Sequence, residues 1–78
     1  MENKVLDIIK NVTDYQEITL DSDIDLIESN ILDSLAFIEL ITSLEEGFDI
    51  EIQPTQVNPD VWRKVQRIIK FVKEKIGS

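Results

Sequence analysis

The sequence predicts an all-α fold, a small bundle of four helices in a single domain that covers residues 1–78. Three segments repeat apolar residues at helical spacing, one near each end of the chain and one in the middle. The stretch 13–32 has no such period, which predicts a long loop between the first two helices. A chain of 78 residues, 42% of them hydrophobic, has room for one compact core.

The first helix is expected near the N-terminus, where Val5, Ile8, Ile9 and Val12 follow the i, i+3, i+4, i+7 spacing of one helix face. Residues 1–10 lack the basic start and the apolar block of a secretory signal. No apolar run in the sequence approaches the length that crosses a bilayer. We therefore expect a cytoplasmic protein without stable membrane insertion.

The long loop contains apolar residues that can pack under the helices, so we expect it to be held in place. These residues are Ile18, Leu20, Ile24, Leu26, Ile27, Ile31 and Leu32. Ile52 and Val57, which follow the middle helix, are expected to pack in the same way.

The middle helix is expected to run from about Ser34 to Phe48. Asp33 or Ser34 can act as its N-cap, because each side chain offers an oxygen to the free amides of the first turn. One face is apolar and would lie against the core, through Phe37, Leu40, Ile41, Leu44 and Phe48. The adjoining side would form a second, small apolar surface edged by carboxylates, made of Ser34, Leu35, Ile38, Thr42 and Glu45, with Glu39 and Glu46 at its edge.

Two helices are expected after the middle one. A short third helix fits Pro59 to Arg63, with Asn58 as its cap and Trp62 buried against the bundle. The last helix would begin near Lys64 and Val65 and stop at Gly77. Its apolar stripe is Val65, Ile68, Ile69, Val72 and Ile76.

Charge is unevenly distributed along this chain of net charge −8. Residues 1–60 contain fifteen acidic and two basic side chains, whereas residues 61–78 contain six basic and one acidic. An acidic surface repels nucleic acid and anionic membranes and favours partners with basic docking surfaces. The simpler interpretation is that the acidity only keeps the protein soluble.

The chain contains neither cysteine nor histidine. This composition excludes a disulfide framework, a thiolate metal site and a histidine-based catalytic triad. We expect no enzymatic activity, because no set of residues supplies a base, a nucleophile and an oxyanion donor together. Residues 21–25 copy the first half of a calcium-binding loop, but Leu26 and Leu32 stand where that loop needs glycine and glutamate, so no metal site is expected.

The tripeptide Asp33-Ser34-Leu35 is the most informative feature of the sequence. It would place an exposed hydroxyl at the start of a helix, beside free backbone N–H groups that favour an anion such as a phosphodiester. Asp33 adds a charge that a modifying enzyme can recognise. The simpler alternative is that Asp33 and Ser34 only cap the helix.

The surrounding residues extend this pattern: Glu28-Ser29-Asn30-Ile31-Leu32-Asp33-Ser34-Leu35, then Ile38-Glu39-Leu40, Leu44-Glu45-Glu46 and Phe48. The arrangement resembles the acyl and peptidyl carrier proteins over essentially the whole chain, which implies a bundle of the acyl-carrier type. The resemblance implies that Ser34, flanked by Asp33 and Leu35, accepts 4′-phosphopantetheine from coenzyme A. The thiol of that arm would then carry an acyl or aminoacyl group as a thioester.

The same resemblance makes the helix that starts at Ser34 the surface that partner enzymes recognise. Leu35 and Ile38 would be apolar anchors, and the polar residues Glu39, Thr42, Glu45 and Glu46 would surround them. The alternative is that the glutamates form a solvated helix face. The implied partners are a phosphopantetheinyl transferase, an acyl-activating or adenylating enzyme, and acyltransferases or synthases with basic docking surfaces. The carrier itself is expected to be a monomer.

The sequence leaves the cargo open. We expect a stand-alone carrier for fatty acid, polyketide or nonribosomal peptide biosynthesis. An alternative comes from Val57-Asn58-Pro59-Asp60-Val61-Trp62, with Arg67 just before Ile68-Ile69, which resembles the D-alanyl carrier proteins that serve D-alanylation of teichoic acids. An alternative of another class is a helical interaction module that is never modified.

The sequence departs from the carrier pattern at Asn30, where many carriers have glycine. Asparagine tolerates the left-handed backbone, so the turn before the attachment site is expected to form. Ala36 also stands where many carriers have an acidic residue or glycine.

Overall fold

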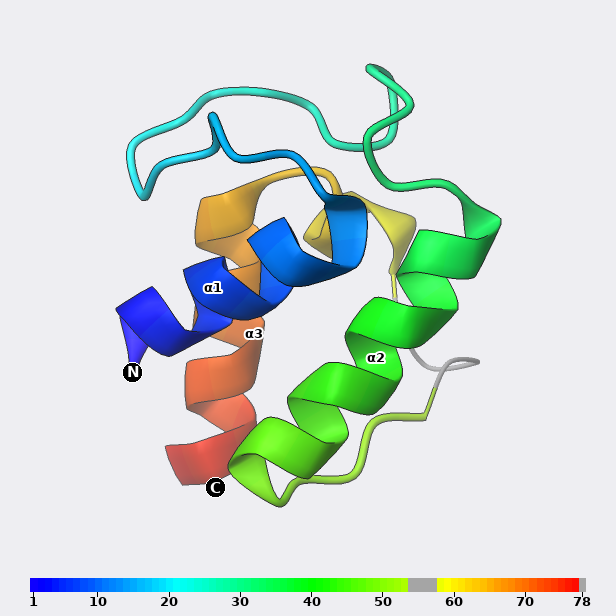
Figure 1. The fold of residues 1–78 in the computed structure, drawn as a ribbon. Coiled ribbons are helices and arrows are strands. Elements are labelled where there is room, and N and C mark those ends of the chain that lie inside the picture. Colours follow the sequence, from blue (N-terminus) through cyan, green and yellow to red (C-terminus); the bar gives the residue numbers. More distant parts are fainter. Residues whose placement is uncertain (54–57, 78) are drawn as a thin grey trace.

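The computed structural model describes residues 1–53 and 58–77 of the chain (Figure 1). Its elements are α1 (Glu2–Thr13), α2 (Ser34–Phe48), the 3₁₀ helix η2 (Pro59–Trp62) and α3 (Val65–Gly77). Every regular element within those ranges is helical, which confirms the all-α class. None of these helices is both long and apolar enough to cross a membrane.

The expected bundle of four helices is not confirmed: the described residues form three α-helices, and the short third helix expected at Pro59 to Arg63 is the 3₁₀ turn η2. Asn58 caps this turn as expected, and its side chain accepts a hydrogen bond from the Asp60 N–H at 3.0 Å. The Val61 N–H then donates to the Asn58 carbonyl at 2.9 Å, which is the i to i+3 bond of a 3₁₀ helix. The Arg63 N–H donates to the Asp60 carbonyl at 3.5 Å, again an i to i+3 bond, and the turn ends there.

The α2 helix begins and ends where the sequence predicts. Its buried residues are Ala36, Leu40, Ile41 and Leu44, and Phe37 and Phe48 pack partly against the same core. It ends at Asp49, which has a left-handed backbone with φ of 54° and donates its N–H to the Glu45 carbonyl.

The α1 helix packs against both α2 and α3. It buries Val5 and Ile9 as expected and also Leu6, which lies outside the predicted stripe, whereas Ile8 and Val12 are only partly buried. Gly47 permits a close approach of α1 to α2, because a Cβ atom there would lie 3.1 Å from Ile8 Cδ1. Lys4 donates to the Gly47 carbonyl, so α1 also caps the C-terminal end of α2.

Trp62 is buried, with 1% of its surface exposed, as the sequence predicts. Its ring meets Phe37 of α2 and Phe71 of α3 edge to face, with centroids 5.5 Å away in both cases. The three rings therefore join α2, η2 and α3 in one core. Ile52 is buried as expected, while Val57 lies outside the described residues.

The loop between α1 and α2 crosses the top of the bundle in Figure 1. Ile18, Leu26 and Leu32 are buried, and the other apolar residues of the loop pack partly against the core, which confirms the predicted packing. The beginning of α3 also holds the loop through polar contacts, since Gln66 Nε2 donates to the carbonyls of Leu20 at 2.7 Å and Ser22 at 2.9 Å.

The α3 helix buries four of the five residues of its predicted stripe: Val65, Ile68, Ile69 and Val72. The fifth, Ile76, is exposed, because it lies in the last turn of the helix, beyond the core. A salt bridge of 3.2 Å between Lys73 and Glu2 fixes α3 to the start of α1.

Candidate functional site

Ser34 is the first residue of α2, and its side chain is exposed. Asp33 is the N-cap, since its Oδ1 accepts from the Ala36 N–H at 2.8 Å and its carbonyl accepts from the Phe37 N–H at 2.8 Å. The Ser34 hydroxyl is therefore not needed as the cap. Within the described part of the chain it forms no hydrogen bond, and neither do the N–H groups of Ser34 and Leu35.

The turn before Ser34 is fixed by its backbone. Asn30 has a positive φ of 63°, which confirms the expected left-handed turn. The Leu32 N–H donates to the Leu26 carbonyl at 2.8 Å, and both leucine side chains are buried. Ser34 thus follows an anchored segment on one side and begins a regular helix on the other.

Leu35 and Ile38 are 68% and 61% exposed, although both are large apolar side chains. Glu39, Thr42 and Glu46 are also exposed on α2. We refer to Leu35, Ile38, Glu39, Thr42 and Glu46 as the exposed α2 face. Two apolar side chains of α2 are therefore exposed instead of packing in the core, and carboxylates lie beside them.

Glu45, which the sequence groups with this face, has a different environment. It is half-buried, and its Oε2 accepts from the Ile52 N–H at 3.0 Å. Its carbonyl accepts from the Ile50 N–H at 3.1 Å. Glu45 therefore fastens the segment that leaves α2, and the sequence offers no signal that separates it from Glu46.

We expect Glu45→Ala to lower the free energy of unfolding by about 1 kcal/mol, because the half-buried Ile52 N–H would lose its acceptor. Glu46→Ala removes the same side chain from the next position, where it is exposed, and should leave stability unchanged. Urea denaturation followed by Trp62 fluorescence measures both variants. Equal stability of the two would contradict the role assigned to Glu45.

Two of the three carboxylates that resemble half of a calcium loop form salt bridges with basic residues of the same chain. Asp23 Oδ1 lies 3.1 Å from Lys64 Nζ, and Asp25 Oδ2 lies 3.0 Å from Arg63 Nη1. The N–H of Glu28 and the guanidinium of Arg63 lower the pKa of Asp25 below its usual value. The separation of an acidic loop from a basic C-terminal segment is a sequence signal that the two segments attract each other, but it does not indicate which residues pair.

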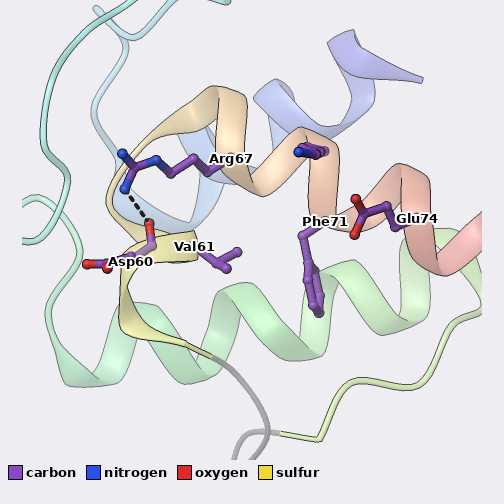
Figure 2. Close-up of a pocket in the computed structure, with 6 residues that line it drawn as sticks. Asp60, Val61, Arg67, Phe71 and Glu74 are labelled. Carbon is purple, nitrogen blue, oxygen red and sulfur yellow. Dashed lines mark hydrogen bonds between the residues drawn. The ribbon is translucent and has the colours of Figure 1, made fainter.

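Arg67 has a structural partner beside η2. Figure 2 shows a groove between η2 and α3, where Arg67 Nη1 donates to the Asp60 carbonyl at 3.2 Å. Lys70 and Glu74 also line this groove, so its charge is mixed. Arg67 therefore ties the 3₁₀ turn to the helix that follows it.

Comparison with known proteins gives consistent matches. The family described as "Phosphopantetheine attachment site" matches residues 3–72. The chain is 39% identical over 75 residues to a D-alanyl carrier protein of Lactococcus lactis subsp. lactis (strain IL1403), in an alignment that covers 96% of this chain and 95% of the relative. It is 30% identical over 78 residues to a D-alanyl carrier protein of Abiotrophia defectiva, covering 100% of this chain and 99% of the relative.

Proposed function

The chain belongs to the family of carrier proteins with a phosphopantetheine attachment site, and from this membership we propose that Ser34 is the residue to which the arm is attached. As a carrier protein it holds its cargo as a thioester on 4′-phosphopantetheine. The observation that carries the proposal is the exposed Ser34 hydroxyl at the first position of α2, beside the Asp33 cap.

The residues around Ser34 fit a covalently attached phosphate. The N–H groups of Ser34 and Leu35 point toward the N-terminal end of α2 without an acceptor among the described residues. Unpaired N–H groups and the helix dipole both stabilise an anion at this end. The negative charge of a phosphodiester on Ser34 would therefore be stabilised at this end of α2.

Ser34 is not activated by its own chain. The Ser34 hydroxyl forms no hydrogen bond to a carboxylate in the described part of the chain, and the sequence has no histidine. The base that takes the hydroxyl proton must therefore come from the transferase, which agrees with a carrier that performs no bond chemistry itself.

For the cargo we favour D-alanine over fatty acyl, polyketide and other aminoacyl groups. Relatives named D-alanyl carrier protein align with nearly the whole chain, which supports this choice. The test is to incubate the phosphopantetheinylated protein with ATP in two separate reactions, one with a D-alanine-activating enzyme and D-alanine, the other with an L-alanine-activating enzyme and L-alanine. A thioester that forms with D-alanine in preference to L-alanine supports the assignment, and equal or absent loading contradicts it.

The partners that we propose are a phosphopantetheinyl transferase and an adenylating enzyme whose basic surfaces bind the exposed α2 face. Leu35 and Ile38 would supply the apolar contact, and Glu39 and Glu46 would attract the partner. In this proposal residues 1–78 act as one monomeric carrier domain in the cytoplasm.

Reversing both charges in Glu39→Lys/Glu46→Lys should lower kcat/KM for attachment of the arm roughly tenfold at low salt, because charge complementarity speeds the encounter. The difference should shrink as salt is added, since salt screens exposed charges. Initial rates with a transferase, measured at two ionic strengths, check this prediction.

The matched control is Asp7→Lys/Asp21→Lys, which reverses two exposed acidic residues, one on α1 and one in the loop after it, and changes the net charge by the same amount. This variant should be modified at a rate close to that of the unaltered protein. If both charge variants slow equally, net charge rather than the exposed α2 face would explain the effect.

A further inference from the structure

Arg63, at the junction of η2 and α3, contacts the loop that leads to Ser34 with both its side chain and its backbone. Its Nη1 donates to Asp25 Oδ2 at 3.0 Å, and its carbonyl accepts from the Leu26 N–H at 2.7 Å. Its Nε lies 3.3 Å from Asp60 Oδ1, so the guanidinium lies between two carboxylates. Because the guanidinium is planar and contacts a carboxylate on each of two sides, it fixes the orientation of these carboxylates as well as their distance from Arg63.

Asp25 organises the turn that precedes Ser34. Its Oδ1 accepts from the N–H groups of Ile27 at 3.1 Å and Glu28 at 2.9 Å. Its carbonyl accepts from the Ser29 N–H at 3.0 Å and the Ser29 hydroxyl at 2.6 Å. One aspartate therefore holds three consecutive residues of the turn, while its remaining oxygen is held by Arg63.

A continuous series of contacts connects this turn to the modification site. The backbone carbonyl of Arg63 accepts the Leu26 N–H, and the Leu26 carbonyl accepts the Leu32 N–H at 2.8 Å. Asp33 follows directly and caps α2 through the Ala36 N–H. The side chains of Leu26 and Leu32 are buried in the core. The loop therefore cannot adjust its position freely when Arg63 is displaced.

We propose that Arg63 is a positioning residue which, through Asp25, sets the place and orientation of the Ser34 hydroxyl for the transferase. The proposal rests on the assignment of Ser34 as the attachment site. In this proposal Arg63, in the basic C-terminal segment, does more than balance the charge of the acidic residues. It also has a structural role at a site 29 residues earlier in the chain.

The neighbouring Lys64 provides a matched control. Lys64 Nζ contacts Asp23 of the same loop, at 2.8 Å from its carbonyl and 3.1 Å from its Oδ1, but Asp23 lies before the turn that Asp25 organises. Arg63→Gln and Lys64→Gln each remove one positive charge from adjacent positions. Neither Lys64 contact reaches residues 25–29, so its loss should leave the turn before Ser34 in place.

The experiment measures attachment of the arm to the full chain with coenzyme A and a broad-specificity transferase, at a temperature where circular dichroism shows each variant to be folded. We expect Arg63→Gln to lower kcat about tenfold with KM nearly unchanged, because a misplaced reacting group affects the chemical step. Lys64→Gln should leave kcat within about twofold of the unaltered protein. Asp25→Asn should resemble Arg63→Gln, and the double variant should be no slower than the slower single variant, as expected for two residues that act as one unit.

Amide hydrogen exchange gives a second measurement that does not depend on the transferase. Arg63→Gln should speed exchange at Glu28, Leu32 and Ala36 while leaving Ile9 in α1 unchanged, because the loosening is local. Equal kcat for Arg63→Gln and the unaltered protein, or equal losses for Arg63→Gln and Lys64→Gln, would overturn the positioning role. If the unaltered protein is not modified on Ser34, the proposed attachment site itself fails, whatever the variants do.

Discussion

Ser34→Ala is expected to abolish attachment of 4′-phosphopantetheine completely, so that the variant keeps its unmodified mass after incubation with coenzyme A and a transferase. The reason is chemical, because alanine has no oxygen from which the phosphodiester can form. The loss should not come from unfolding, since Ser34 is exposed and Asp33, rather than Ser34, caps α2. Circular dichroism of the variant should therefore match that of the unaltered protein.

Ser29→Ala is the matched control for this variant. Ser29 is another exposed serine, five residues earlier, but its hydroxyl donates to the Asp25 carbonyl at 2.6 Å. Its replacement should leave one arm attached per chain. An Ser34→Ala protein that still gains the mass of the arm would show that another side chain accepts it.

Trp62→Ala is expected to cause the largest loss of stability among single substitutions in this fold, about 3–5 kcal/mol. Trp62 is 1% exposed and fills the space between Phe37 and Phe71, so its truncation removes contacts to α2 and α3 at the same time. Small domains have little stability in reserve, so a loss of this size is a large share of the total. Circular dichroism during urea denaturation measures it, because the variant lacks the chain's one tryptophan.

Two further variants serve as controls for the stability loss predicted for Trp62→Ala. Trp62→Phe keeps an aromatic ring and removes the buried indole N–H, which has no acceptor among the described residues, so it should cost much less than alanine. Leu35→Ala truncates a large apolar side chain that is 68% exposed and should change stability little. A Trp62→Ala protein as stable as Leu35→Ala would contradict the packing described for η2.

The sequence was sufficient for the features that depend on local chemistry. The limits of α2 follow from an apolar period that starts directly after the capping Asp33, and the left-handed turn at Asn30 follows from the tolerance of asparagine. The exposed pair Leu35 and Ile38 could be identified because it lies outside the core face of the same helix. These features are set by residues that are neighbours in the chain.

Features that depend on distant residues could not be predicted. The salt bridge between Asp25 and Arg63 joins residues 38 apart, and no local pattern selects this pair from the other acids and bases. Glu45 and Glu46 are adjacent and identical in type, and only the path of the segment around Ile52 decides which one accepts its N–H.

The most direct test of the attachment site is to locate the arm within the modified, unaltered protein by mass spectrometry. Trypsin would leave Ser34 in one long peptide, because residues 11–62 contain no lysine or arginine. Cleavage after aspartate and glutamate instead separates Ser29, Ser34 and Ser43 into the peptides 29–33, 34–39 and 40–45. We predict one arm per chain, on peptide 34–39 alone. An arm on either of the other peptides, or a protein that gains no arm at all, would contradict the assignment of Ser34.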